Sequence, residues 1–494
     1  MANPTDTSAS QPGPRIREIP LKPIDQRAPV GDIRTIVFFV IRQHLNEELL
    51  RQSLDNLIRN HLPILGSRIR RTEEKGPLVY HLPEAFAPDA LLFAWSSSRV
   101  STTLDESKLL PDVPDSKCAI NWGPDVTKIE DKWTPPDWPR EFVEDGPDTP
   151  LVLVHLTKYT DATVLAINVP HAVSDQKGLG SMVQAWLAVA RGEQPEPFIE
   201  LEEDALNGPS DISQSELRRK GEYRLKTKGE HIRSIMSFMP DIIRNRKEDR
   251  RVLFLSGTAV AALREKCNKS LGQTHGADVP LITNGDVVTC VLAKLANLHR
   301  KKPMKLAIGE TVNARGRCDT LPVDKHYLHN CPAYACARLK FSRDTPLSEL
   351  ARLHRLSVIE TSKPANIERS FAVSLGVYNG GYAFPLNGPG ETSYHVTNWS
   401  SAWHNLDFSS VVEQSAGTNI VKGLHGAAVY GGSGNEPSLL VLGHAVQRKH
   451  SVHRLHAPVM CKAYGGYWCD FACSTKTMAL VEELLQRDPM LDSL

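Results

Sequence analysis

Residues 163–175 read TVLAINVPHAVSD, an apolar run that ends at a proline and is followed by a histidine and, four residues later, an aspartate. Aliphatic and β-branched runs of this length are typical of buried strands. Over the following residues, 178–191, an apolar side chain recurs at about every third or fourth position, which is typical of a helix. The stretch therefore predicts a strand, a short loop and a helix, with His171 at the end of the strand and Asp175 beside the helix N-terminus.

Strands and helices are expected on both sides of this stretch. Segments 150–159 and 163–170 are separated by a short polar turn, which favours a hairpin. The pattern predicts strands at 34–41, 150–159, 163–170, 252–256 and 305–312, and helices at 46–60, 178–191, 257–269 and 284–300. Both halves therefore mix the two element types, and we expect an α/β fold.

A charged segment separates the two halves. Residues 216–231, ELRRKGEYRLKTKGEH, have almost no apolar period, which is typical of a solvated face or a linker. A length of 494 residues allows two or three domains. We therefore expect one domain at 1–198, a charged crossover linker at 199–251 and a second domain at 252–494.

The overall charge is almost balanced, with 58 Lys and Arg against 57 Asp and Glu. A net charge of +1 gives no general attraction to nucleic acid or to an anionic membrane, so neither is expected as a partner. The N-terminal residues lack the pattern of a secretory signal, and no apolar run approaches the roughly 20 residues that span a bilayer. With nine scattered cysteines, an odd number, we expect reduced thiols, a cytoplasmic location and, by default, a monomer.

Several common chemistries have no motif in this sequence. The G-x-S-x-G, P-loop, G-x-G-x-x-G and H-E-x-x-H patterns are all missing. The histidines near the C-terminus follow no standard ligand spacing, so we expect no metal site and place them on exposed loops; they are His444, His450, His453 and His456. These absences leave the His171–Asp175 pair as the leading candidate for chemistry.

The position of His171 suits acid–base work. A histidine with an ordinary pKa near 6.5 is a good general base at neutral pH, and the end of a strand can aim its ring into a cleft. The alternative is that the spacing arises by chance and that Asp175 simply caps the helix. The two residues alone leave both interpretations open.

Further segments surround this pair in a fixed order. They are PLKPID at 20–25, PILGSR at 63–68, NARGR at 313–317, YLHN at 327–330, TNW at 397–399 and LDF at 406–408. Together with HAVSD at 171–175, their order and spacing resemble the HxxxD, or BAHD, superfamily of acyl-CoA-dependent acyltransferases, and especially its fungal trichothecene 3-O-acetyltransferases. The resemblance covers nearly the whole chain.

The sequence departs from the family pattern at three places. Gln176 stands where a glycine usually follows the motif aspartate, and Gly178 comes two residues later. His329 replaces the glycine of Y-x-G-N, and residues 409–410 are serines in place of the glycine and tryptophan of D-F-G-W-G. His171 and Asp175 themselves are intact, so the resemblance implies an active enzyme.

The resemblance also implies an architecture and a reaction. We expect two chloramphenicol-acetyltransferase-like domains, each a mixed sheet flanked by helices, joined by a long crossover and meeting along a solvent channel. Acyl-CoA, most simply acetyl-CoA, would be a co-substrate, and no permanently bound cofactor is expected. The acceptor would be a hydroxyl of a small terpenoid, polyketide or alkaloid, and His171 would take its proton.

The same resemblance assigns roles to the other motif residues. Asp175 would be structural and would pair with Arg315 or Arg317, in the segment that begins at Asn313, and Asp407 would make a similar tie. The indole N–H of Trp399 and the hydroxyl of Thr397 are the candidate donors to the oxyanion. Three alternatives stay open: a carrier-protein thioester as donor, N- in place of O-acylation, and a non-catalytic binding member of the fold.

Overall fold

The computed structural model describes residues 15–26, 28–73, 76–110, 117–201, 205–206, 208–276, 278–413, 439–444 and 452–494. His450 and the N-terminal residues that bear on a secretory signal lie outside this part of the chain. Each of the nine elements expected above is present within it. The strands β2 (Arg34–Ile41) and β8 (Thr163–Pro170) have the predicted bounds, and the other elements differ by a few residues at their ends.

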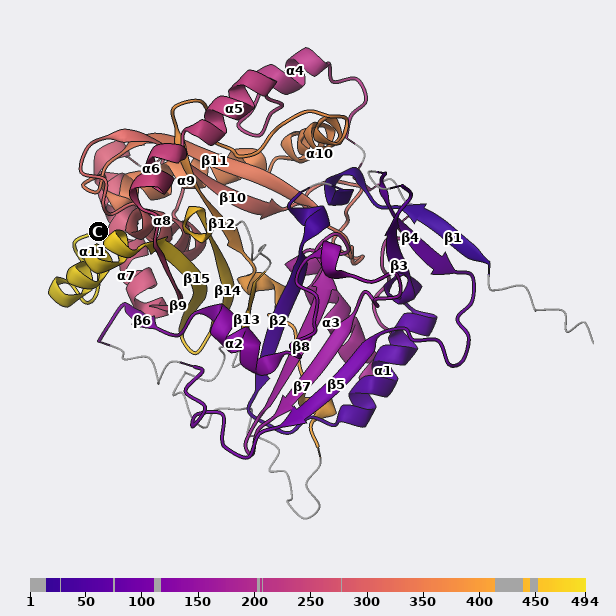
Figure 1. Ribbon diagram of the computed structural model, residues 1–494. Coiled ribbons are helices and arrows are strands. Elements are labelled where there is room, and N and C mark those ends of the chain that lie inside the picture. The colour runs from indigo at the N-terminus through magenta and orange to yellow at the C-terminus, as the bar shows by residue number, and fades with distance from the viewer. Residues whose placement is uncertain are drawn as a thin grey trace, which may run out of the picture.

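A five-stranded sheet forms the centre of the N-terminal part (Figure 1). Its order is β13 (Leu440–His444), β2, β8, β7 (Leu153–Lys158) and β5 (Ala94–Arg99). β7 and β8 form the predicted antiparallel hairpin. Every residue of β2 and β8 is buried, which explains why both read as continuous apolar runs rather than as alternating ones.

Two helices cover this sheet side by side, α1 (Glu47–Asn60) and α3 (Gln176–Ala190). The Trp186 indole of α3 donates to the Leu50 carbonyl oxygen of α1 at 2.9 Å, which fixes the contact between them. A separate three-stranded sheet, β1 (Ile16–Pro20), β4 (Leu78–Pro83) and β3 (Arg68–Arg71), lies beside this layer. The helix that follows the His171 loop is therefore anchored in a rigid core.

A seven-stranded sheet forms the centre of the C-terminal part (Figure 1). Its order is β11 (Pro332–Phe341), β10 (Met304–Asn313), β12 (Thr392–Asn398), β14 (His456–Ala463), β15 (Gly466–Ser474), β9 (Glu248–Ser256) and β6 (Ile120–Trp122). The helices packed on it include α7 (Gly257–His275), α8 (Asn284–Ala296), α9 (Leu347–Thr361), α10 (Pro364–Tyr378) and α11 (Thr475–Arg487). The mixed α/β class, with helices flanking the sheets, is thus confirmed.

Each sheet takes an edge strand from the other part of the chain. β13 pairs with β2 in the N-terminal sheet, and β6, which precedes the His171 loop by some fifty residues, pairs with β9 in the C-terminal sheet.

His444 on β13 contacts the buried carboxylate of Glu130, which lies on α2 (Val126–Trp133). The expected exposed loop is therefore wrong for His444, because the residue is buried in a strand. The domain boundaries at 198 and 252 stay a prediction.

The crossover segment is folded. Within 199–251 the structure has α4 (Gln214–Arg219), α5 (Lys228–Met236), α6 (Met239–Arg244) and the start of β9. Leu217, Tyr223 and Leu225 are buried in a cluster with residues of β10, β11 and α10. A few apolar residues therefore anchor this segment on the C-terminal sheet, and its role as a charged crossover linker between two domains stays a prediction.

None of the helices in the described residues has both the length and the apolar character needed to cross a bilayer.

Candidate active site

His171 lies directly after β8, at the end of the buried strand. Its backbone N–H donates to the Ile33 carbonyl oxygen at 2.9 Å. This bond extends the pairing of β8 with β2 beyond the ends of the two strands. The side chain is partly exposed, but its Nδ1 is buried and has no hydrogen-bond partner among the described residues. The described part of the chain therefore leaves the hydrogen-bonding capacity of this ring nitrogen unused.

The surroundings of His171 favour its neutral form. Burial lowers the pKa of the imidazole below its ordinary value of 6.5, and the nearby carboxylate of Asp175 opposes this only in part. A lowered pKa means that the ring carries a free lone pair at neutral pH. The residue can therefore accept a proton from a bound group without first having to lose one.

Asp175 is bound to the surrounding scaffold through its carboxylate. Its Oδ1 accepts a hydrogen bond from the Gly178 N–H at 2.9 Å and caps α3. The Arg315 guanidinium binds the same carboxylate with both terminal nitrogens, at 2.9 and 3.1 Å. Burial alone would raise the pKa of Asp175, but the charge and hydrogen bonds of Arg315 outweigh it and lower that pKa. The aspartate is therefore an ionised structural link.

Arg315 also gathers the backbone around this link. It donates to the carbonyl oxygens of Tyr327 at 3.0 Å and His329 at 2.7 Å. Asn313, at the end of β10, accepts from the Arg315 Nη1 at 2.9 Å. Of the two arginines considered from the sequence, the structure thus places Arg315 on Asp175. Arg317 is exposed, and its Nε donates to the Asn313 carbonyl oxygen at 2.9 Å.

Segment 327–331 braces the loop of residues 171–175 almost residue by residue. Asn330 Nδ2 donates to the His171 carbonyl oxygen at 2.7 Å, and the Ser174 hydroxyl donates to the Leu328 carbonyl oxygen at 2.7 Å. The Cys331 N–H completes the brace at the carboxylate of Asp175, at 3.3 Å. Since 327–331 belongs to the C-terminal half, these bonds fix the loop across the junction of the two halves.

Close packing at this junction explains Gly178, the glycine displaced from its usual place. A Cβ on Gly178 would lie 1.8 Å from the Leu328 carbonyl oxygen. Any side chain there would separate α3 from the brace. Gln176, by contrast, occupies the buried first position of α3 and has room for its side chain.

We expect the Gly178→Ala variant to lose about 3 kcal/mol of unfolding free energy, because the backbone must shift to admit the methyl group. Urea denaturation would measure this loss. The matched control is Gly272→Ala on α7, where an added Cβ meets nothing within 4 Å. That variant should be neutral or more stable by up to about 1 kcal/mol. Similar small effects at both positions would contradict the close approach.

His329, which replaces the family's glycine, is part of the brace. Its Nδ1 donates to the Val173 carbonyl oxygen at 2.9 Å, and the ring is buried between Tyr80 and Tyr327. Burial lowers the pKa of His329 to about 4, so the residue is neutral at ordinary pH. The substitution adds one more bond to the loop of residues 171–175 instead of loosening it.

We expect His329→Gly to lower kcat by about tenfold or more, because the loop loses one of its supports. The acid limb of the pH–activity profile should stay where it is, since His329 does not titrate near neutral pH. His329→Asn, whose side-chain amide can still donate to Val173, should recover most of the rate. A shift of the acid limb in His329→Asn would contradict this positioning role.

The sequence missed one buried acid behind the brace. Asp25 is almost fully buried, and its Oδ1 accepts from Asn330 Nδ2 at 2.7 Å. Burial raises the pKa of Asp25 well above its ordinary value, and the hydrogen bond from Asn330 opposes this only in part. The only sign of this contact in the sequence was the acidic residue in the motif at 20–25. Its partner, Asn330, lies 305 positions away, so the sequence alone could not identify it.

The two candidate oxyanion donors lie at the end of β12. The Thr397 hydroxyl is buried and unpartnered among the described residues, and Thr397 is in register with Thr311 of β10. Trp399 is half-buried against the N-terminal core, and its backbone N–H donates to the Val459 carbonyl oxygen at 2.8 Å. Thr397 is thus the candidate with an unused buried donor.

Asp407 does not make the tie expected of it. The residue is exposed, and its Oδ1 accepts from the Ser409 N–H at 2.9 Å. Within the described residues the structure forms no ion pair at this carboxylate. The neighbouring Phe408 is the buried member of the segment and packs 5.8 Å from Phe39, measured between ring centroids. Apolar packing thus holds this segment in place.

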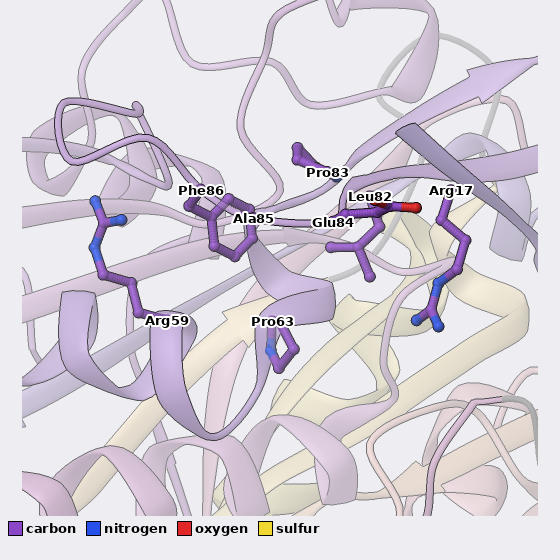
Figure 2. Close-up of a pocket in the computed structure, with 8 residues that line it drawn as sticks. All are labelled: Arg17, Arg59, Pro63, Leu82, Pro83, Glu84, Ala85 and Phe86. Carbon is purple, nitrogen blue, oxygen red and sulfur yellow. The ribbon is translucent and has the colours of Figure 1, made fainter. Parts of the chain in front are cut away.

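A separate surface pocket of about 610 Å³ lies in the N-terminal part (Figure 2). Its lining comes from β1, α1, β4 and the residues after them, with Phe86 and Pro63 between two arginines. At one end of the pocket, the Arg59 guanidinium already donates to the Asp55 carboxylate at 2.8 Å and to two backbone carbonyl oxygens. No residue of the 171–175 loop or its brace lines this pocket.

Comparison with known proteins finds a matching family model and several similar sequences. A model described as the transferase family matches residues 138–357, which contain both the His171 loop and its brace. Acetyltransferase adrJ of Penicillium rubens is 23% identical over 388 residues, which cover 75% of this chain and 78% of that protein. A protein named transcriptional regulator calD, of Penicillium decumbens, is 22% identical over 489 residues, 96% of each chain.

A solved structure shares the fold along nearly the whole length. F. graminearum TRI101, complexed with coenzyme A and T-2 mycotoxin, superposes with a TM-score of 0.64 at 12% identity, covering 94% of this chain and 97% of that one. The family match, the named relatives and the shared fold agree with the HxxxD arrangement of His171 and Asp175. The chain therefore resembles this transferase family over residues 138–357, has the fold of F. graminearum TRI101, and is a transferase enzyme.

Proposed function

We propose that this enzyme transfers an acyl group, most simply acetyl, from coenzyme A to a hydroxyl group of a small secondary metabolite. The observation that carries the proposal is the partly exposed His171 ring, held at a braced loop with an unpartnered Nδ1 and a pKa lowered by burial. Acetyltransferase names among the fungal relatives favour acetyl as the group transferred. Coenzyme A bound to F. graminearum TRI101 supports acyl-CoA as the donor.

In this mechanism His171 is the general base. The acceptor oxygen attacks the thioester carbonyl carbon while its proton passes to Nε2 of His171. The tetrahedral intermediate then collapses, the carbon–sulfur bond breaks, and the coenzyme A thiolate takes the proton back from the imidazolium. No acyl-enzyme forms, so the reaction needs both substrates bound together.

The negative oxygen of the intermediate needs a hydrogen-bond donor. The buried, unpartnered hydroxyl of Thr397 suits this role, with the indole N–H of Trp399 as the second candidate. Asp175, with Arg315, serves the reaction by holding the loop that presents His171. Its carboxylate is already fully engaged by the guanidinium and two backbone N–H groups.

A second candidate is a non-catalytic member of the fold. The transcriptional regulator name carried by a relative that matches 96% of this chain is the observation in its favour. The intact His171 and Asp175 and the engaged brace around them argue for catalysis. The two functions differ in whether a thioester is consumed.

Incubation of the full chain with acetyl-CoA and a panel of terpenoid, polyketide and alkaloid alcohols tests the proposal. We expect thiol release matched by a product whose mass increases by one acetyl group. A parallel reaction with an acetylated carrier protein separates the two kinds of donor, and amine acceptors separate N- from O-acylation. A folded chain that binds these ligands but releases no thiol above background hydrolysis would favour the non-catalytic candidate.

A further inference from the structure

Helices α5 and α6 place one polar residue each against the protein and several apolar residues outward. On α5 the Ser234 hydroxyl is buried and donates to the Asn387 carbonyl oxygen at 2.9 Å. On α6 the Asp241 carboxylate faces the buried guanidinium of Arg454, with 3.4 Å between Oδ2 and Nε. A helix on the surface of a soluble protein normally has the opposite arrangement.

The outward side of these helices is rich in exposed aliphatic and sulfur-containing side chains. The exposed fractions are 49% for Ile232, 43% for Ile235, 58% for Met236 and 57% for Ile243. Positions 232, 235 and 236 are spaced as neighbours on one side of a helix, opposite the buried Ser234. Figure 1 shows α5 and α6 at the rim of the C-terminal part, far from the α1–α3 layer. We call these four residues with the cations described next the α5–α6 surface.

Positive charge surrounds the apolar residues. The exposed cations are Lys228, Arg233, Arg244, Arg246 and Lys247. Within the described residues the structure pairs none of these five with a carboxylate. The acids of the two helices are already engaged, because Glu230 binds Arg224 at 2.8 Å and Asp241 faces Arg454. These five exposed cations, beside two acids that are already paired, give the two helices a local excess of positive charge that the net charge of +1 does not show.

Exposed apolar side chains with exposed cations on the same two helices suit one kind of partner. The apolar residues can enter the headgroup region of a bilayer while the cations bind anionic lipid headgroups. A second copy of this chain suits the surface less well, because a two-fold contact would bring like charges together. We propose that the α5–α6 surface docks the enzyme on an anionic membrane. The net charge of the whole chain is near zero, and on that ground no membrane partner was expected. The net charge does not show that cations are concentrated on these two helices.

Flotation of the full chain with lipid vesicles tests the proposal. We expect the protein to float with vesicles of phosphatidylcholine and phosphatidylserine, and to stay in solution with phosphatidylcholine alone. Raising the salt concentration should release it, because salt screens the headgroup attraction. The double variants Ile232→Ser with Met236→Ser, and Arg244→Glu with Arg246→Glu, should each weaken the partition by about tenfold or more.

Matched variants elsewhere on the chain keep the result specific. Leu281→Ser with Val323→Ser removes two other exposed apolar residues, and Lys301→Glu with Lys302→Glu reverses two other exposed charges. Both should float like the wild type, and all four variants should keep its melting temperature. The proposal is overturned if the wild type stays in solution with both vesicle types or if the α5–α6 variants float unchanged. It is equally overturned if the surface mediates self-association or binding of an acidic carrier protein and the full chain does not float with either type of vesicle. Vesicle binding is measured without turnover, so its failure says nothing about the proposed reaction.

Discussion

The His171→Ala variant should lose acyl transfer by a factor of about 10²–10⁴ in kcat while its melting temperature stays near that of the wild type. The large catalytic loss is expected because the ring is the proposed proton acceptor. The small structural cost is expected because Nδ1 makes no hydrogen bond within the described residues. The backbone bonds to Ile33 and Asn330 remain, since they use main-chain atoms of residue 171.

The pH dependence provides a second measurement of the same role. Wild-type kcat/KM should rise with pH through the lowered pKa of His171, below 6.5, and then reach a plateau. This limb should vanish in the residual activity of His171→Ala. His275→Ala, at an exposed position near the end of α7, is the control and should keep both rate and profile. A folded His171→Ala enzyme with wild-type turnover would refute the role proposed for His171.

The Arg315→Ala variant should lower the free energy of unfolding by about 3–5 kcal/mol, because it leaves the mostly buried Asp175 carboxylate without its counter-ion. Two backbone carbonyl oxygens, those of Tyr327 and His329, lose their donor in the same change. Calorimetry or urea denaturation would measure the loss. Arg315→Lys should recover only part of it, since an ammonium group cannot reproduce the two-pronged contact.

Arg317→Ala provides the matched control, since it removes an exposed arginine two residues away. Its effect should stay within about 0.5 kcal/mol. Acid should reduce the difference between wild type and Arg315→Ala, leaving the part that comes from the two carbonyl oxygens. The pKa of Asp175 is lowered in the folded protein, so the pair stabilises fully above the ordinary value of 3.8 and is lost as pH falls through the folded value. Equal destabilisation by the two alanine variants would contradict the assignment of Arg315.

The parts of the fold that sequence predicts well are those fixed by local patterns. β2 and β8 match their predicted bounds because both are buried along their whole length and read as continuous apolar runs. α4, α5 and α6 escaped prediction for the converse reason, since their sequence is charged and their anchors are few. The outward apolar residues of α5 and α6 also break the usual rule that the apolar side faces the core.

The parts of the site that sequence leaves undetermined depend on contacts between distant segments. The spacing of NARGR does not distinguish Arg315 from Arg317, and only the approach of β10 to the Asp175 loop separates them. His329 appeared as a departure from a glycine pattern, while the structure gives it a bond to Val173. Asp407 shows the reverse error, because a motif position suggested a buried tie and the residue is exposed.

The exchange of edge strands has a consequence for how the chain is made. β2 and β8 leave the ribosome early, but β13, which completes their sheet, is synthesised some 270 residues after β8. At translation rates of roughly 5–20 residues per second, the edge of β2 waits on the order of tens of seconds for its partner. Exposed strand edges promote aggregation, so the nascent N-terminal half is a natural client for chaperones. Separate expression of that half would leave the edge permanently open.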